Sequence, residues 1–268
     1  MANNRNKFGG KWQKVLKKFG GKWQNHYLCT HKTLKVSKMN KTVFRRKIYE
    51  DMLNWKNEQK GETALLVEGA RRIGKSTIVE EFAKREYDSY MFIDFSVASP
   101  EVVRRFDDLS NIEDLFTYLQ FRYNVTLQEG KSVVIFDEVQ MAPKARQAIK
   151  HLVKDGRYHY IETGSLISIR KNVMDIVIPS EETRLQMFPM DYEEFRWALG
   201  DDTTVGLLRQ AFLKMRPLGD DIHRQMMRNF RLYMLVGGMP QAVAKYLETR
   251  SLAEVDRDCR LILSVVDS

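Results

Sequence analysis

A glycine-rich segment with one lysine and two hydroxyl residues, GARRIGKST, occupies residues 69–77. It fits the pattern G-x-x-x-x-G-K-[ST], in which glycines let successive backbone N–H groups point at phosphate oxygens. Lys75 would contact the β- and γ-phosphates, and the hydroxyl of Ser76 would bind Mg²⁺. The pattern therefore predicts a site for a nucleoside triphosphate and its magnesium ion. The residues expected to surround the phosphates are Gly69, Ala70, Arg71, Arg72, Ile73, Gly74, Lys75, Ser76 and Thr77.

Two adjacent acids follow an apolar run in the segment VVIFDE, which ends with Asp137 and Glu138. The apolar run predicts a buried strand, and open parallel sheets bind ligands at the carboxyl ends of their strands. Asp137 would hold Mg²⁺ through water, and Glu138 would orient and deprotonate an attacking water molecule. The alternative is that both acids merely open a loop. The phosphate-binding pattern upstream favours the catalytic interpretation.

Three further residues are candidates for contacts with the γ-phosphate or the attacking water. In YHYIETGS, Thr163 or Ser165 could hydrogen-bond to either group, and Ser165 could instead cap the next helix. Arg184 could act across a subunit interface and stabilise the charge of the transition state. A solvated arginine ahead of a strand is the simpler interpretation of Arg184.

Short apolar strands alternate with amphipathic helices between residues 43 and 190. Strands are predicted at residues 63–69, 90–96, 132–138, 158–165 and 184–190. Helices are predicted at residues 43–59 and 75–85, and around residues 112–119 and 145–152. This alternation predicts an α/β fold with a parallel sheet covered by helices on both faces. After Asp191 only helical patterns follow, so a domain boundary is expected near residue 190.

The composition is typical of a folded chain without membrane spans. The 268 residues are 43% apolar, yet no window of 18 consecutive apolar residues occurs. Two cysteines, Cys29 and Cys259, cannot form a disulfide framework, which favours a cytoplasmic location. The formal charge is +9, but residues 1–38 hold ten of the 44 basic residues and none of the 35 acidic ones. The remainder is nearly neutral, so the overall charge does not predict nucleic-acid binding by the folded body.

The seven residues KFGGKWQ occur twice near the N-terminus, beginning at Lys7 and at Lys18. The 11-residue spacing is close to three helical turns, which would place the aromatic residues on one face among lysines. Such a face is typical of a segment that binds a membrane surface or nucleic acid, whereas two Gly-Gly pairs oppose a stable helix. We expect residues 1–38 to be a disordered or non-native extension, with the true start at Met39.

Several of these segments, taken in order, resemble the prokaryotic AAA-family ATPases that carry a C-terminal domain of unknown function. The segments are EGARRIGKST, VIFDEVQ, IETGS, FPMDYEEF and YMLVGGMPQAV. The resemblance implies a P-loop NTPase three-layer sandwich with strand order 5-1-4-3-2, followed by a small all-helical lid. It also implies a slow ATPase that uses MgATP to drive a conformational switch in a client or complex. In VGGMP, Gly237 and Gly238 would end one helix and Pro240 would begin the next.

The resemblance also sets the expected organisation of the chain. It covers about residues 43–257, and members of the family continue further, so the C-terminal region is expected to be truncated. The expected domains are the extension 1–38, the AAA-type ATPase domain 39–190, and the helical lid with the start of the C-terminal region, 191–268. Beyond ATP, the partners considered are a second copy of the chain, a protein client and DNA.

Two other functions remain compatible with the motifs. A P-loop kinase would usually need an arginine-rich lid, and no Gly-flanked arginine cluster follows the predicted sheet. The adjacent acids Asp137 and Glu138 also favour water as the nucleophile. A nucleic-acid-binding ATPase module could use the basic N-terminal segment and a basic helix face that a solvated surface also explains. That face would contain Lys144, Arg146, Lys150, His151 and Lys154.

Overall fold

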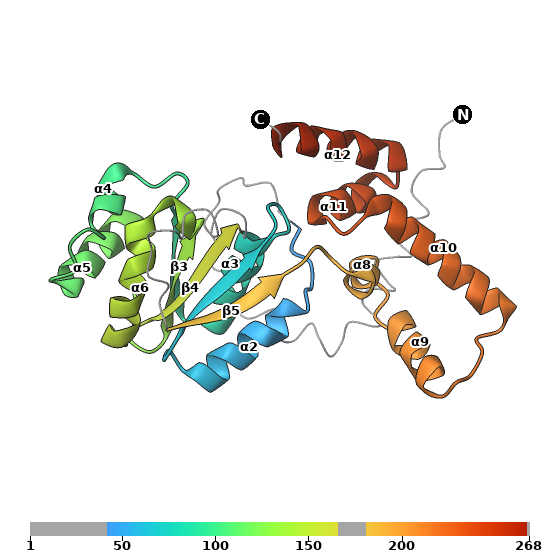
Figure 1. Cartoon of the computed structure of the whole chain (residues 1–268), viewed down its shortest axis with the longest axis horizontal. Coiled ribbons are helices and arrows are strands. Elements are labelled where there is room, and N and C mark those ends of the chain that lie inside the picture. The colour runs from blue at the N-terminus through green and yellow to red at the C-terminus, as the bar shows by residue number, and fades with distance from the viewer. Residues whose placement is uncertain (1–41, 166–180, 267–268) are drawn as a thin grey trace, which may run out of the picture. The chain divides into compact units, whose positions relative to one another are not determined.

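The computed structural model describes residues 42–165 and 181–266, and the strands within them form one parallel sheet (Figure 1). The strands are β1 (Ala64–Gly69), β2 (Ser89–Asp94), β3 (Ser132–Asp137), β4 (His159–Ser165) and β5 (Glu182–Met187). Their order in the sheet is β2-β3-β4-β1-β5. Read from the other edge this is 5-1-4-3-2, so the predicted α/β class and strand order are confirmed. Because the strands are parallel, the carboxyl ends of β1, β3 and β4 meet at one edge of the sheet.

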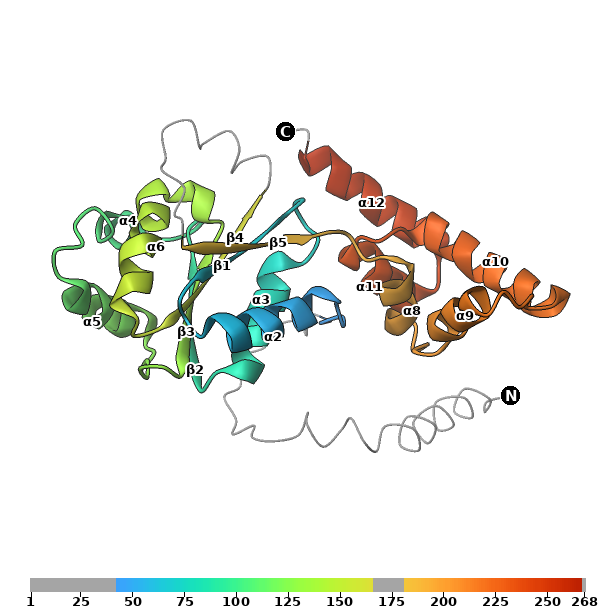
Figure 2. The ribbon, with the colours of Figure 1, turned by 60° about the horizontal axis from the view of Figure 1, so that its bottom comes forward.

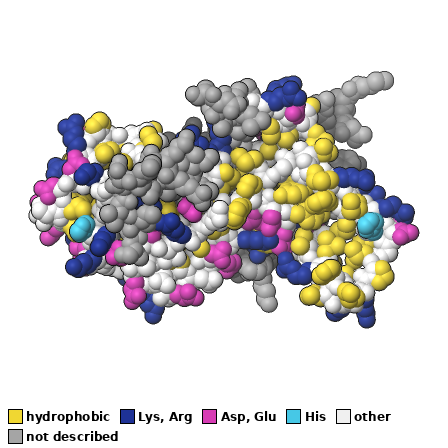
Figure 3. Space-filling model, in the orientation of Figure 1, with side chains coloured by type: hydrophobic (Ala, Val, Ile, Leu, Met, Phe, Trp, Pro, Cys, Tyr) yellow, Lys and Arg dark blue, Asp and Glu magenta, His cyan; other side chains and the backbone are white. Residues whose placement is uncertain are grey.

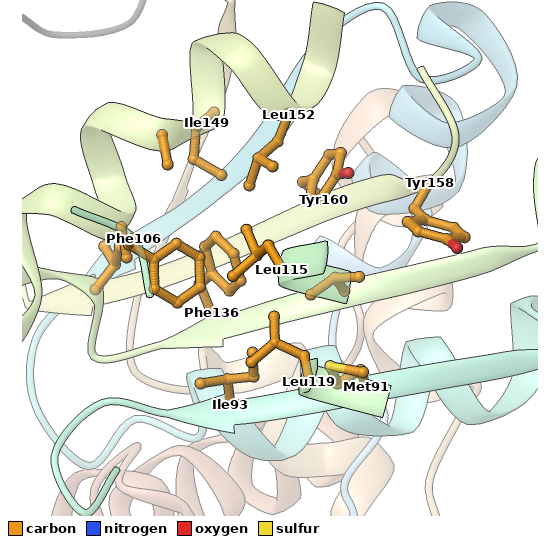
Figure 4. Close-up of a cluster of buried hydrophobic side chains, with 14 of the residues drawn as sticks. Met91, Ile93, Phe106, Leu115, Leu119, Phe136, Ile149, Leu152, Tyr158 and Tyr160 are labelled. Atoms are coloured by element: carbon orange, nitrogen blue, oxygen red, sulfur yellow. The ribbon is translucent and has the colours of Figure 1, made fainter. Parts of the chain in front are cut away.

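Helices pack against both faces of this sheet (Figure 2). One face is covered by α4 (Pro100–Arg104), α5 (Ile112–Tyr123) and α6 (Pro143–Asp155). Figure 4 shows the core on this side, where Phe136 and Tyr160 of the sheet meet Leu115 and Ile149 of the helices. The other face is covered by α2 (Ile48–Gln59) and α3 (Lys75–Glu86).

The sequence of β3 contains an uninterrupted apolar run because this strand lies in the interior of the sheet. All of its residues are buried, because side chains alternate between two covered faces. Val134 and Phe136 belong to the core on one face, whereas Val133 and Ile135 belong to the core on the other. The strand therefore carries Asp137 to its carboxyl end with no freedom to slip in register.

The C-terminal part of the described chain is helical and has a hydrophobic cluster of its own. Its helices are α8 (Tyr192–Ala198), α9 (Thr204–Leu213), α10 (Asp220–Val236), α11 (Pro240–Thr249) and α12 (Leu252–Val266). Phe195, Val236 and Val243 are buried in this cluster. Gly237 ends α10 with a φ of 78°, and Pro240 begins α11, as predicted.

Several large apolar side chains of α9 and α10 remain exposed. Figure 3 shows hydrophobic side chains gathered over the helical region. The exposed residues on these two helices include Leu207, Phe212, Leu213, Ile222, Met227, Phe230, Met234 and Leu235. Among residues 42–165 and 181–266, no helix is both long and apolar enough to span a bilayer.

The largest differences between the structure and the sequence-based elements lie at the first helix and the fifth strand. The first helix begins at Ile48 rather than at Val43, and β5 covers Glu182–Met187 rather than residues 184–190. The backbone carbonyl of Phe188 accepts a hydrogen bond from Arg46, and Met190 N–H donates to the carbonyl of Gly238. These residues therefore pair outside the sheet, which ends the strand earlier than its apolar pattern indicates. The expected extension 1–38 lies outside the described residues, and the expected domain boundaries stay a prediction.

Candidate nucleotide-binding site

The loop between β1 and α3 begins with a glycine that no other residue could replace without movement. A Cβ atom on Gly69 would lie 2.3 Å from the carbonyl oxygen of Met187 and 2.8 Å from Cδ1 of Ile73. Ile73 is fully buried in the core between the sheet, α2 and α3, and so anchors the middle of the loop. Gly74 then adopts a φ of 94°, a left-handed conformation, and α3 starts at Lys75.

This geometry leaves the N-terminal N–H groups of α3 at the carboxyl edge of the sheet. The first N–H groups of a helix have no partner within the helix, and the helix dipole adds partial positive charge there. Arg72 has a φ of 64°, which is uncommon for a residue with a Cβ. When residues in right-handed and left-handed backbone conformations alternate, their N–H groups point into the same concavity, and this arrangement binds phosphate.

The Lys75 ammonium lies within the curve of this loop. Its Nζ donates to the carbonyl of Gly69 at 3.1 Å and to that of Ala70 at 2.7 Å. The residue is buried, and this burial lowers the pKa of Lys75, although Glu138 and Asp137 act in the opposite direction. An ammonium with so little access to water gains strongly from an anionic ligand at the same position.

Asp137 ends β3 beside the phosphate loop. Its carboxylate accepts a hydrogen bond from the hydroxyl of Thr163, and the hydroxyl of Ser76 lies beside it. Burial raises the pKa of Asp137, the two hydroxyls lower it, and the carboxylates of Asp94 and Glu138 raise it further. Asp94 is its neighbour in register at the end of β2. The structure thus brings together the two residues that the sequence assigned to the metal, Ser76 and Asp137.

Glu138 has a strained backbone and defined partners. Its φ is 52°, and its N–H donates to Oγ1 of Thr163 at 3.3 Å. The side-chain amide of Gln140 donates to the Glu138 carboxylate. Sequence reasoning missed Gln140, which lies in a short 3-10 helix, η2 (Val139–Met141). The sequence signal for it was a polar residue two positions after Glu138.

Thr163 and Ser165 take different positions at the end of β4. Thr163 is fully buried and contacts both acids of the β3 terminus. Ser165 is also buried but lies in register with Gly69 of β1. The geometry therefore favours Thr163 over Ser165 as the residue that responds to a ligand at the acid pair. The helix that Ser165 was considered to cap would lie outside the described residues.

Arg184 is not brought to this site. It lies within the edge strand β5, in register with Leu66, and forms an ion pair with Glu182 at 3.4 Å. Its side chain is 42% exposed. A role in another protomer's site stays a prediction.

The position of Arg146 contradicts its expected place in a basic face on α6. Its guanidinium is buried under the sheet and pairs with Glu182 at 3.2 Å, so it contributes nothing to a basic surface. Glu162 is fully buried close to this pair. Burial and the neighbouring Glu182 carboxylate raise the pKa of Glu162 well above its ordinary value, although Arg146 opposes the shift.

The residues at the sheet edge suit a nucleotide with magnesium. Ser76 and Asp137 offer a hydroxyl and a carboxylate oxygen, the hard donors that Mg²⁺ prefers. Gly69, Gly74 and Lys75 form a cradle of backbone N–H groups around a buried cation. The donor set and the cradle therefore fit a phosphate ester with a bound Mg²⁺.

Several solved structures are similar to the chain at low sequence identity. A Walker-type ATPase from Pyrococcus abyssi is 17% identical, with 88% of this chain and 78% of that chain covered and a TM-score of 0.48. The Orc1 protein of Aeropyrum pernix, solved in complex with DNA, is 12% identical, with 60% and 49% covered and a TM-score of 0.39. The RuvB Holliday junction branch migration motor of Thermotoga maritima is 14% identical, with 59% and 51% covered and a TM-score of 0.34. The chain thus spans about half the length of the Orc1 and RuvB chains.

Sequence comparison gives a clearer result than these structural likenesses. No curated protein sequence matches the chain. A protein-family model described as an AAA domain matches residues 61–196, which is just over half of the chain. The matched stretch contains the phosphate loop, the acid pair and Thr163. Because this model covers more than half of the chain, the chain belongs to the AAA domain family.

Proposed function

We propose that the protein binds MgATP at the carboxyl edge of its sheet and hydrolyses it slowly. The observation that carries this proposal is the convergence of Lys75, Ser76, Asp137 and Thr163 from the loop after β1 and the ends of β3 and β4. A chance match to a phosphate-loop pattern would not be accompanied by a hydroxyl and a carboxylate in mutual contact beside it. The proposal rests on this geometry together with membership of the family.

In the proposed complex the phosphates replace the carbonyl partners of Lys75. The ammonium turns from the carbonyls of Gly69 and Ala70 to the β- and γ-phosphate oxygens, and N–H groups of residues 70–77 surround the phosphates. Ser76 and Asp137 would hold Mg²⁺, Asp137 through water. When bound, Mg²⁺ neutralises charge on the phosphate oxygens.

Glu138 is the proposed base for hydrolysis. Its carboxylate takes a proton from a water molecule, whose oxygen forms a bond to the γ-phosphorus. The bond between the γ-phosphorus and the bridging oxygen breaks, and the electron pair stays on ADP as it leaves. Gln140 holds the carboxylate through its side-chain amide, and Thr163 fixes the backbone N–H of the same residue. Both contacts keep the base beside Asp137 before the nucleotide binds.

The output of this cycle is proposed to be a movement of the helical region that acts on a protein client. The first residue of α11 in that region lies next to the phosphate loop, since a side-chain carbon of Pro240 is 3.7 Å from the position a Cβ on Gly74 would take. Nothing in the described residues favours a kinase or a nucleic-acid-binding module over this proposal. The burial of Arg146 also removes one residue from the basic face that a nucleic-acid-binding module would use.

Substitutions at Lys75 and Glu138 test the proposal. We expect Lys75→Ala to lose ATP binding, and Glu138→Gln to bind ATP without turning it over, measured by nucleotide titration and phosphate release. Lys84→Ala, on the exposed face of the same helix, and Glu129→Gln, in an exposed turn, are the matched controls. Equal phosphate release by the wild type and Glu138→Gln would remove Glu138 as the base. A wild type that binds no ATP would overturn the proposal.

A further inference from the structure

Arg46 lies just before α2 and connects segments that are far apart in the sequence. It is buried, and its Nη1 donates to the carbonyl of Ile73 at 2.9 Å. Its Nη2 donates to the carbonyl of Phe188 at 2.5 Å, and its Nε lies 3.1 Å from the carboxylate of Glu194. One guanidinium thus contacts the phosphate loop, the exit of β5 and the first helix of the helical region.

The contact with Ile73 bears on the phosphate cradle through the geometry of one peptide unit. In a planar trans peptide the C=O of one residue and the N–H of the next point in opposite directions. Arg46 holds the Ile73 carbonyl on the core side of the loop, so the N–H of Gly74 is directed away from Arg46. Gly74 immediately precedes α3, where free N–H groups meet an anion.

The contact with Glu194 connects the same guanidinium to α8. Glu194 accepts from the N–H of Lys47 at 2.7 Å and from that of Asp191 at 3.2 Å, as the second half of a capping box. Both partners of the Arg46–Glu194 ion pair are almost fully buried. A movement of α8 would therefore either carry the guanidinium with it or leave two buried charges apart, which is strongly unfavourable.

We propose that Arg46 is a positioning residue, which aims the Gly74 N–H at the nucleotide phosphates and ties that orientation to α8 through Glu194. The inference rests on the proposed function, because it assigns to that site the link between phosphate binding and the helical region. A nucleotide that fixes the Ile73–Gly74 peptide then favours one position of α8. The strength of the coupling equals the difference in phosphate-binding free energy between this position of α8 and any other.

A purely structural ion pair would have a different consequence. Its loss would lower the stability of the free protein, and nucleotide affinity would fall only as the folded fraction fell. A positioning residue changes affinity in protein that is still folded. Lysine at position 46 separates the two roles, because one ammonium can pair with Glu194 but cannot also reach two carbonyls in a fixed fork.

The test compares Arg46→Lys with Arg45→Lys in the full chain. Arg45 is the adjacent control, since its side chain is exposed and lies 4.2 Å from the Trp197 ring centre. We expect Arg46→Lys to bind MgATP and MgADP about tenfold or more weakly, while its melting temperature without nucleotide stays near that of the wild type. Arg45→Lys should match the wild type in both. Unchanged affinity of folded Arg46→Lys would overturn the inference and leave the proposed function intact.

Glu194→Gln tests the connection to α8 separately. The carboxylate uses one oxygen for Lys47 and the other for Asp191, so the single amide oxygen of Gln can keep one of these two bonds, and the charge that pairs with Arg46 is gone. In hydrogen exchange, MgATP should protect α8 in the wild type and should not do so in Glu194→Gln, although this variant still binds MgATP. Equal protection in both would overturn the coupling, even if Arg46→Lys proved unable to fold. A wild type that binds no nucleotide would overturn this inference and the proposed function together.

Discussion

The hydroxyl of Thr163 on β4 donates a hydrogen bond to the carboxylate of Asp137 on β3. The same oxygen accepts the N–H of Glu138 at 3.3 Å. One buried hydroxyl therefore holds both acids at the end of β3. We therefore propose Thr163, rather than Ser165, as the residue that responds to what binds between the acids; sequence reasoning left these two residues equivalent.

Removing the Thr163 hydroxyl should change the pH dependence of hydrolysis. That hydrogen bond lowers the pKa of Asp137, so Thr163→Val should raise the pKa of this carboxyl further. Since Asp137 must be ionised to hold Mg²⁺, we expect the acid limb of the rate profile to move to higher pH. Thr163→Ser keeps the hydroxyl and should keep the wild-type profile. Identical acid limbs in Thr163→Val and wild type would contradict the role of this bond.

Two glycine-to-alanine substitutions should change the free energy of unfolding in opposite directions. One tests close packing and the other tests chain entropy. Gly69→Ala places a Cβ against the carbonyl oxygen of Met187, and we expect a loss of about 1–3 kcal/mol in the free energy of unfolding. Gly206 lies within α9 with open space around it, so Gly206→Ala should gain about 0.5–1 kcal/mol. Urea unfolding measures both. A neutral result for Gly69→Ala would mean that β5 shifts freely.

Stability should decrease toward alkaline pH because of Glu162. Its pKa is raised in the folded protein, so the proton is held more tightly there than in the unfolded chain. The stabilisation is complete below the ordinary pKa of 4.5 and is lost as pH rises through the folded value.

Glu162→Gln keeps the shape of this side chain and cannot ionise. We expect its melting temperature to match that of the wild type at pH 5 and to exceed it at pH 8. Glu129→Gln is the exposed control and should follow the wild type at both pH values. Parallel melting curves for Glu162→Gln and wild type across this range would show that Glu162 stays ionised in the folded protein.

Self-association would place Arg184 near a neighbouring site. This arginine is partly exposed on the edge strand β5, and two strands separate β5 from β3, which ends at the acid pair of its own chain. We expect specific ATPase activity to rise with protein concentration, and Arg184→Ala to remove that rise. Arg122→Ala, an exposed arginine on α5, should leave the rise intact. Constant specific activity from nanomolar to micromolar protein would exclude an arginine supplied in trans.

Residues 1–38 should be dispensable for folding and for ATP turnover. Thr42–Ser268 forms a compact unit of its own, and it contains the sheet, both of its helix layers and the phosphate loop. A chain that begins at Met39 should match the full chain in melting temperature and phosphate release. It should lose only salt-sensitive binding to anionic lipid or nucleic acid. A drop of several degrees in melting temperature would assign a structural role to the repeated aromatic residues.

Patterns within short stretches of sequence determined the fold class and most of the candidate site. The loop at residues 69–77 could be predicted because its glycines, its lysine and the flanking strand and helix all lie within one local unit. The same holds for Asp137, because an apolar run places it at a strand end, and for the turn after Val236, where Gly237 and Pro240 have positional preferences. In each case, a few neighbouring residues contain the physical information.

Only the tertiary structure decided which distant side chains meet. Arg46 reaches Ile73, 27 residues away, and Phe188, 142 residues away, and no periodicity in the sequence connects these positions. Likewise the burial of Arg146 against Glu182 depends on how α6 lies on the sheet. The choice between Thr163 and Ser165 depended on the packing of β4 against β3. Residue patterns specify faces and ends of elements, whereas contacts between elements follow from register and packing, which are properties of the whole chain.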